Sequence, residues 1–260
     1  MFFTRGPFMK LIDTHAHLED LENLGASIHR AEEAGVIAVI TMGTDYESNR
    51  WVLEESSKHQ TSKLRIYPAI GVHPWGLDAS KLDVNVQFIE ENVSKAIALG
   101  EIGLDYWYRE ARKSEEAKEL QRMLFRKMLR IAEKTKKPVS IHSRGAWADC
   151  VDMTIEANIK KAVFHWFTGP LDVLEKIFDN GYYVSATPAV AYSKHLRTVI
   201  EHTPLEHLLL ETDSPVLYQG TPSEPVHVLK ALSGVAELKN EKLETIAEKT
   251  TENAKHFFSI

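Results

Sequence analysis

The segment LIDTHAH, at residues 11–17, joins a strand-like run to two polar side chains at its end. The apolar residues at its start are typical of a strand that is buried in a parallel sheet. His15 and His17 are two positions apart, so on a strand both imidazoles project from the same face. Two histidines in this arrangement can chelate one cation. Taken alone, the pattern fits solvated histidines at a strand end equally well.

Runs of the same texture recur along the chain and alternate with stretches of helical periodicity. The further strand-like runs lie at residues 36–43, 66–73, 96–105, 138–142, 162–167, 182–187 and 208–213. The clearest helix is predicted over residues 115–136, where Leu120, Leu124 and Ile131 fall on one apolar stripe. Shorter helices are expected at residues 45–59, 84–98, 171–180 and 241–258.

Eight strands that alternate with helices in 260 residues predict an α/β fold, a (β/α)8 TIM-type barrel in a single domain. An open, doubly wound sheet is the structural alternative. It is less favoured because no Gly-rich dinucleotide-binding fingerprint follows the first run. We assign residues 10–260 to the barrel and residues 1–9 to a short N-terminal extension, because the organised pattern begins only at Lys10.

The composition excludes several classes of protein. With 43% hydrophobic and 26% charged residues, the chain has the balance of a soluble globular protein. No apolar run approaches the roughly 20 residues of a membrane-spanning helix. The net charge of −6 argues against a broad basic surface for sequence-independent binding of nucleic acid. The single cysteine, Cys150, cannot form an internal disulfide, so we expect a reducing, cytoplasmic location.

Most of the predicted strands end in side chains that can bind a metal ion. In a barrel of this type the catalytic groups lie at the carboxyl ends of the strands, where such side chains would converge. The candidates are His15, His17, His73, Glu101, Asp105, His142, His165, Glu211 and Asp213. Each histidine taken singly could be a satisfied buried side chain, but several at equivalent positions favour metal ligation.

Two carboxylates among these candidates suit different tasks. Glu101 lies between Gly100 and Gly103, which allow close backbone approach in a crowded site, and a carboxylate can bridge two cations. For Glu101 alone, a buried or solvated side chain beside a turn is the competing interpretation. Asp213 follows an apolar run and needs a cation or hydrogen-bond donors nearby. It could hold a metal ion and also accept a proton from a metal-bound water.

As a set, these motifs resemble those of the TatD-family metal-dependent deoxyribonucleases. The motifs are DTHAHL (13–18), GVHP (71–74), GEIGLDY (100–106), IHSR (141–144), FHWFTG (164–169) and ETDSP (211–215). They occur in the family's order, and with Glu224, Pro225 and the final helix the resemblance covers essentially the whole chain after Lys10. The resemblance implies a DNA substrate that is cleaved exonucleolytically, at single-stranded ends.

The resemblance also implies a pair of divalent cations, which could be Zn²⁺, Mg²⁺ or Mn²⁺. The implied ligands are His15, His17 and Asp213 for the first cation, Glu101 as a bridge, and His142 and His165 for the second. Asp213 would also act as general base in hydrolysis by a metal-activated water. The residues implied to lie near the site are His73, Arg144 and Glu211. Arg144 could bind a phosphate or form a structural salt bridge.

The chain departs from the family pattern at two places. Trp166 and Thr168 stand where the family often has Cys and Ser, and Trp166 could alter the pocket wall and the choice of substrate. Residues 219–223 read QGTPS where the family commonly carries basic residues, which weakens the phosphate-binding side of the nuclease prediction. Aromatic residues near the strand ends, such as Trp75 and Trp107, could stack on bases or simply pack in the wall.

Two other functions stay open at the level of the sequence. An amidohydrolase-type enzyme could use the same barrel and ligands on a small-molecule amide, ester or phosphoester, because fold does not fix function. A lysine often bridges the metals in that wider group, so Glu101 favours the nuclease. A non-catalytic, metal-stabilised binding protein is the third possibility, and the full ligand set with a candidate base disfavours it.

Overall fold

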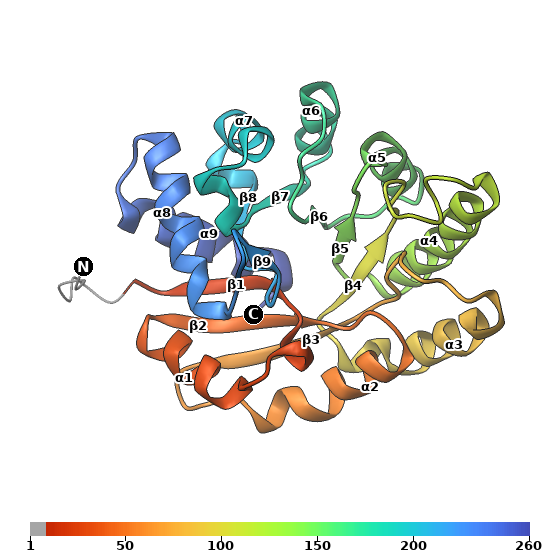
Figure 1. Ribbon diagram of the computed structural model, residues 1–260, viewed down its shortest axis with the longest axis horizontal. Helices are drawn as coiled ribbons and strands as arrows, with labels where there is room; N and C mark the ends of the chain where they lie inside the picture. Colours follow the sequence, from red (N-terminus) through yellow and green to blue (C-terminus); the bar gives the residue numbers. More distant parts are fainter. Residues whose placement is uncertain (1–8) are drawn as a thin grey trace.

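In the computed structural model of the protein, which describes residues 9–260, eight parallel strands form one sheet in their order along the chain. The strands are β1 (Leu11–Ala16), β2 (Val36–Met42), β3 (Arg65–Ile70), β4 (Ala98–Gly103), β5 (Val139–His142), β6 (Ala162–Phe164), β7 (Tyr183–Ala186) and β8 (Leu208–Leu210). Helices surround the ring of strands (Figure 1). The predicted (β/α)8 barrel is confirmed. Of the predicted extension at residues 1–9, residues 1–8 lie outside the described residues.

Nine α-helices occur in the described part of the chain. They are α1 (Leu24–Glu33), α2 (Tyr46–Glu55), α3 (Leu82–Asn92), α4 (Glu115–Thr135), α5 (Trp147–Glu156), α6 (Leu171–Asp179), α7 (Lys194–His202), α8 (Val228–Lys239) and α9 (Leu243–Phe258). None of them, within residues 9–260, has the length and apolar character to cross a membrane. The helix predicted over residues 84–98 is wrong at its carboxyl end, because Ala98 already pairs with Ala69 of β3 as part of the sheet.

The lumen of the barrel is filled by apolar side chains below the carboxyl ends of the strands. Ile12, Ile40 and Met42 are fully or almost fully buried there, and Phe257 of α9 packs against the same cluster. Since α9 closes the amino end of the barrel, the opposite end is the place where polar side chains can gather around a cavity.

A β-bulge interrupts each of the two strands that deliver the first candidate ligands. The register of β1 against β2 shifts between residues 13 and 16, and that of β4 against β5 shifts between residues 99 and 102. One extra residue reverses the alternation of side chains along a strand. Ile12 and His15 are three positions apart and would face opposite sides of a regular strand, but the bulge turns both to the lumen. The bulge in β4 likewise turns Glu101 to the lumen.

The barrel closes between β1 and the segment that follows β8. Oδ1 of the buried Asp13 accepts a hydrogen bond from the backbone N–H of Thr212 at 2.8 Å, and Oδ2 accepts one from the Thr212 hydroxyl at 2.6 Å. The backbone N–H of Asp213 donates to the carbonyl oxygen of His15 at 2.8 Å. These bonds satisfy a carboxylate that water does not reach, and they hold His15 and His17 beside Asp213.

We expect Asp13→Ala to lower the free energy of unfolding by about 2–4 kcal/mol, because both Thr212 donors lose their buried acceptor. Asp13→Asn keeps an acceptor for the Thr212 N–H and should cost less. Urea-induced unfolding followed by circular dichroism measures the change.

The control is Asp83→Ala, since the Asp83 side chain is 95% exposed and pairs with the exposed Lys127. We expect this variant to lose less than about 1 kcal/mol. An equal loss in the Asp13 and Asp83 variants would contradict the role assigned to Asp13.

Candidate metal centre

Five imidazoles surround the carboxylate of Glu101 in the mouth of the barrel. They belong to His15, His17, His73, His142 and His165. These histidines end or follow β1, β3, β5 and β6, and Glu101 itself lies on β4. Only 2% of Glu101 is exposed, so its charge is balanced by these neighbours rather than by water. The structure thus brings the predicted strand-end side chains to one place.

The two oxygens of Glu101 face different histidines. Oε2 lies 3.3 Å from Nε2 of His15 and 3.3 Å from Nε2 of His17. Oε1 lies 2.8 Å from Nδ1 of His142, 2.8 Å from Nε2 of His165 and 3.3 Å from Nε2 of His73. A carboxylate placed in this way can give one oxygen to each of two neighbouring cations.

The glycines beside Glu101 are needed for this crowding. A Cβ atom on Gly100 would lie 2.8 Å from Cβ of Ser140 on the next strand. Gly103 has a φ of +142°, and a Cβ there would lie 2.0 Å from the carbonyl oxygen of His142. No larger side chain fits either position without moving the strand that carries His142.

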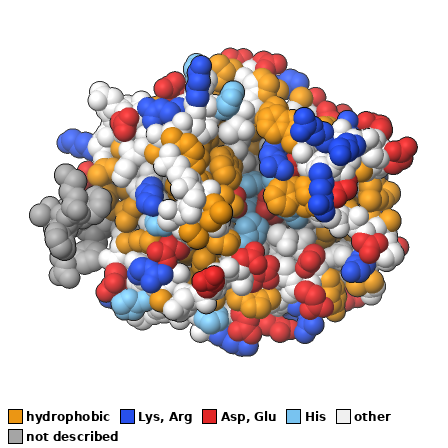
Figure 2. Space-filling model, viewed as in Figure 1, with side chains coloured by type: hydrophobic (Ala, Val, Ile, Leu, Met, Phe, Trp, Pro, Cys, Tyr) orange, Lys and Arg blue, Asp and Glu red, His pale blue; other side chains and the backbone are white. Residues whose placement is uncertain are grey.

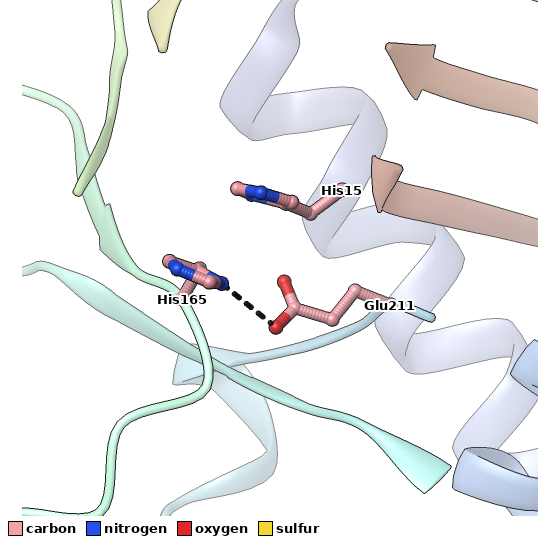
Figure 3. Close-up of side chains that lie close together, drawn as sticks. All are labelled: His15, His165 and Glu211. Carbon is pink, nitrogen blue, oxygen red and sulfur yellow. Dashed lines mark ion pairs between the residues drawn. The ribbon is translucent and has the colours of Figure 1, made fainter. Parts of the chain in front are cut away.

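Two further carboxylates complete the cluster from the segment after β8. Oδ1 of Asp213 lies 3.5 Å from Nε2 of His17 and 3.7 Å from Nε2 of His15. Oε1 of Glu211 lies 3.4 Å from Nδ1 of His165. Figure 3 shows this pair beside the His15 ring, which stacks on the ring of His165 with centres 4.1 Å apart. Asp213 lines the cleft that opens over the cluster, whereas Glu211 is not among the described residues that line it. Glu211 therefore lies on the side of the cluster away from the cleft.

Three sets of potential ligand atoms lie within 4.8 Å of one another. The sets are His15, His17 and Glu101; His73, Glu101 and His142; and His15, His165 and Glu211. Among the described residues, Nε2 of His15, Nδ1 of His165 and Oε2 of Glu211 are buried without a hydrogen-bond partner. Buried polar atoms without partners are uncommon in native structures. Imidazole and carboxylate donors together suit Zn²⁺ and similar divalent ions, so the residues fit a metal centre.

The acidic groups dominate the electrostatics of the cluster. Burial alone would lower the pKa of His17, but Asp213 and Glu101 raise it to about 10. Burial would raise the pKa of Asp213, and the nearby imidazoles of His17 and His15 instead lower it to about 2. His73 differs, because burial lowers its pKa to about 4 in spite of Glu101. At neutral pH, Asp213 is an ionised carboxylate and His73 is a neutral imidazole.

Asp105, to which the sequence assigned no definite role, links the cluster to the wall of the cleft. Its Oδ2 accepts hydrogen bonds from Nε2 of His142 at 2.8 Å, Nε of Arg144 at 2.8 Å and Nε1 of Trp75 at 2.6 Å. When Nε2 of His142 donates to Asp105, its Nδ1 is left with a lone pair on the side of Glu101, where it could bind a cation. The feature of the sequence that could have indicated this role is that Asp105 lies in the same motif as Glu101, at residues 100–106.

Arg144 lies in a structural salt bridge. Besides the bond from its Nε to Asp105, its guanidinium carbon lies 5.1 Å from the centre of the Trp75 ring. Trp75 lines the cleft, but Arg144 does not appear among the described residues that line it. Of the two roles that the sequence left open, the structure contains the salt bridge.

A cleft of about 580 Å³ opens over the cluster, a size typical of small-molecule sites. His17, His73, Glu101, His142, His165 and Asp213 line its floor. Its walls come from the loop after β3, the start of α3 and the segment 215–217. Figure 2 shows pale-blue histidine side chains at the bottom of a central hollow on this face.

Trp166 contacts Glu211 on the side of the cluster away from the cleft. Its backbone N–H donates to Oε1 of Glu211 at 3.0 Å, and its ring centre lies 5.6 Å from that of Tyr218. Tyr218 belongs to a small hairpin of β9 (Leu217–Tyr218) and β10 (Thr221–Pro222). Leu217 lines the cleft, whereas Trp166 is not among the described residues that do. The expected effect of Trp166 on the pocket wall is therefore at most indirect, through Tyr218 and Glu211.

We expect Asp105→Asn to weaken metal binding by about 10- to 100-fold, because donors face both oxygens of Asp105 and an amide can accept on one side only. Oδ1 accepts from the backbone N–H groups of Trp107 and Tyr108, so the NH2 group of Asn must face donors in either orientation. Competition for Zn²⁺ against a chromogenic chelator measures the affinity. The control is Asp149→Asn, since Asp149 accepts from the Tyr106 hydroxyl at 2.6 Å outside the cluster. Wild-type affinity in Asp105→Asn would show that Asp105 does not orient His142.

The sequence of this chain matches a known protein family over nearly its whole length. The family model described as TatD-related DNase matches residues 12–259. The match covers β1 from Ile12 onward, all of the other seven strands of the barrel and every member of the metal cluster.

Single relatives and solved structures agree with this match. An uncharacterized metal-dependent hydrolase of Bacillus subtilis, YabD, is 33% identical over 96% of this chain and 99% of its own length. The human protein named deoxyribonuclease TATDN3 is 28% identical over 95% of this chain and 94% of its own. The crystal structure of YjjV, a TatD homolog from Escherichia coli K12, superposes with a TM-score of 0.85 at 29% identity, covering 97% of this chain and 99% of that one.

Proposed function

The chain belongs to the family of TatD-related DNases and is a metal-dependent hydrolase of ester bonds, and we propose that its substrate is DNA. In this proposal the enzyme removes nucleotides from single-stranded ends. The observation that carries the proposal is the Glu101 carboxylate, whose two oxygens face two separate sets of histidines. Such a group suits a pair of cations, and paired cations are typical of enzymes that cut phosphodiesters.

We assign the ligands by the side of Glu101 on which they lie. His15, His17 and Asp213 would hold the first cation, His142 and His165 would hold the second, and Glu101 would bridge them. His73 lies as near to Glu101 as His15 does, so it borders the second position. Glu211 supports His165 from behind. The ions could be Zn²⁺, Mg²⁺ or Mn²⁺.

When bound by these residues, a pair of cations would supply a nucleophilic water at neutral pH and stabilise the leaving oxygen. The protein's own groups then direct the reaction. The low pKa of Asp213 keeps this carboxylate ionised, and it lines the cleft, so it can take the proton of the attacking water. As the oxygen of water bonds to phosphorus, the bond to the leaving oxygen breaks. That oxygen takes up a proton from solvent, and Asp213 releases its proton to solvent before the next turnover.

The surface beside the cleft supports a single-stranded nucleic acid as substrate. Trp107 is 56% exposed, and an aromatic face of this kind can stack on a base. Trp75 is 45% exposed, but its ring already stacks on that of Tyr108, with centres 5.3 Å apart, and lies beside Arg144. The loop between β4 and α4 also carries Arg109, Arg112 and Lys113, all exposed. Figure 2 shows Lys and Arg side chains gathered beside the hollow on the side of α4 and α5. This loop supplies positive charge that residues 219–223 lack.

A direct test of the proposed reaction uses metal-stripped protein and end-labelled single-stranded DNA, with and without Mg²⁺, Mn²⁺ or Zn²⁺. We expect metal to restore nucleotide release, and Asp213→Ala to lower kcat by about 10²- to 10⁴-fold, because the proton acceptor is lost. The exposed Asp83→Ala is the control and should cleave as the wild type does. Turnover of small esters or amides, with no DNA cleavage under any metal, would overturn the proposal in favour of a small-molecule hydrolase.

The basic loop gives a separate prediction about substrate binding. We expect the double variant Arg112→Glu, Lys113→Glu to raise KM for single-stranded DNA at least about tenfold and to leave kcat nearly unchanged. The dependence of KM on salt should become shallower by roughly two counterions, because two phosphate contacts are lost. Lys160→Glu, before β6 at the opposite end of the barrel, is the control. An unchanged KM and salt slope in the double variant would place the DNA elsewhere.

A further inference from the structure

Ser140 is a polar residue in the lumen of the barrel, one layer below the metal centre. It lies two positions before His142 on β5, so both side chains face the lumen. None of its surface is exposed. Its Oγ lies 3.2 Å from Nδ1 of His15, which comes from β1 on the opposite side of the ring of strands. Within residues 9–260, neither of these two atoms has another hydrogen-bond partner.

The neighbouring strand leaves room for this contact. A Cβ atom on Gly100 of β4 would lie 2.8 Å from Cβ of Ser140. Any larger residue at position 100 would displace Ser140, and with it the hydroxyl that faces His15. The contact between Ser140 and His15 is therefore part of the close packing around the site.

The two ring nitrogens of His15 face different surroundings. Nε2 lies 3.3 Å from Oε2 of Glu101 and 3.7 Å from Oδ1 of Asp213, whereas Nδ1 faces Ser140. The ring of His15 also stacks on that of His165, with centres 4.1 Å apart and planes 13° from parallel, so it is held in this orientation. Nε2 is therefore the nitrogen that could bind the first cation.

The position of one proton decides whether Nε2 can bind a cation. A neutral imidazole carries a single proton, so a lone pair on Nε2 requires an N–H group at Nδ1. None of the surface of His15 is exposed, so this N–H needs a partner from the protein. The hydroxyl of Ser140 is the acceptor within reach. Without it, a buried donor would be left unpaired, which disfavours the tautomer that binds metal.

Two other histidines of the cluster have carboxylates as partners. Oδ2 of Asp105 lies 2.8 Å from Nε2 of His142, and Oε1 of Glu211 lies 3.4 Å from Nδ1 of His165. An ionised carboxylate can only accept, so each of these pairs favours a single tautomer of its histidine.

The hydroxyl of Ser140 differs from these carboxylates because it can donate or accept by rotating. In the metal-free protein it can donate to Nδ1 of His15, and the proton on Nε2 then faces Glu101 and Asp213. In the metal-loaded protein it can accept from an N–H group at Nδ1. The same side chain thus satisfies His15 in both states, and an alanine would satisfy it in neither.

We propose that Ser140 is a positioning residue for His15, whose hydroxyl accepts from Nδ1 and so keeps the lone pair of Nε2 directed at the first cation. The proposal rests on the proposed function only in assigning His15 to that cation. The affinity of one cation then depends on a side chain that touches neither the metal nor the substrate.

The experiment measures zinc binding rather than catalysis. Metal-stripped protein is titrated with Zn²⁺ in competition with a chromogenic chelator. We expect Ser140→Ala to bind one of two zinc ions about tenfold more weakly and the other as the wild type does. If Ser140 only stabilised the fold, the variant would unfold at a lower temperature when metal-free but would bind both ions with wild-type affinity. That result would overturn the proposal.

Ser185→Ala is the matched control. Ser185 is also a fully buried serine on a barrel strand, β7, and its Oγ accepts from the backbone N–H of Trp166 at 3.1 Å. Among the described residues it makes no hydrogen bond to a histidine of the cluster. We expect wild-type zinc affinity in this variant. Equal weakening in the Ser140 and Ser185 variants would show that a small cavity is enough, and would contradict the role of Ser140.

The position of the proton can also be observed directly in the wild type. Long-range ¹H–¹⁵N NMR of zinc-loaded protein with ¹⁵N-labelled histidine distinguishes the two tautomers of each ring. We expect His15 to carry its proton on Nδ1, and this proton to exchange with solvent more slowly than in Ser140→Ala. A proton on Nε2 of His15 in the zinc-loaded protein would refute the proposal whatever the variants do.

Both measurements separate the failure of this inference from the failure of the proposed function. Zinc binding that is weakened in Ser140→Ala, in an enzyme that cuts no DNA, would refute the nuclease and keep the role of Ser140. Metal-dependent DNA cleavage, with the same zinc affinity in Ser140→Ala as in the wild type, would keep the nuclease and refute that role.

Discussion

A negative charge buried in the mouth of the barrel governs the whole site. The Glu101 carboxylate is nearly inaccessible to water, and an unpaired charge in such a place would cost several kcal/mol. The protein meets this constraint with imidazoles that arrive from several strands, so the closed barrel is a precondition of the site. Gly100 and Gly103 are part of the same constraint, because the strand of Glu101 must lie unusually close to the strand of His142. A pair of cations would balance the same charge. The surrounding histidines leave no space beside Glu101 for a larger side chain or a mobile segment.

The sequence predicted the architecture and the membership of the cluster because both follow from simple rules. Parallel strands buried on both faces produce near-continuous apolar runs, and the polar residue that ends each run must lie at the carboxyl end of the barrel. His15, His142 and Asp213 were found in this way, and the resemblance to a known family supplied their order and roles. Helix ends were harder to place, since residues 93–98 are apolar enough for either a last helical turn or the start of β4.

Other features depended on contacts between segments far apart in the sequence. The bulges in β1 and β4 are defined by register against a neighbouring strand, so a rule of strict alternation does not find them. The role of Asp105 follows from three donors that meet only in the folded barrel, and the salt bridge of Arg144 is one of them. The contact between His15 and Ser140 likewise depends on packing, because the sequence shows only a serine within a strand-like run.

The contact between Asp13 and Thr212 also determines how late the barrel can close during synthesis of the chain. Their hydrogen bonds join residues 199 positions apart. The edge of β1 that meets the segment after β8 therefore stays unpaired until almost the whole barrel has been translated. At about 5–20 residues per second, this interval lasts roughly 10–40 s. Throughout it the nascent chain can pair β1 with β2 and β2 with β3, but one edge of the growing sheet stays open, and open edges invite pairing with other chains. A ribosome-bound chaperone that shields β1 would therefore protect this protein at its most vulnerable stage.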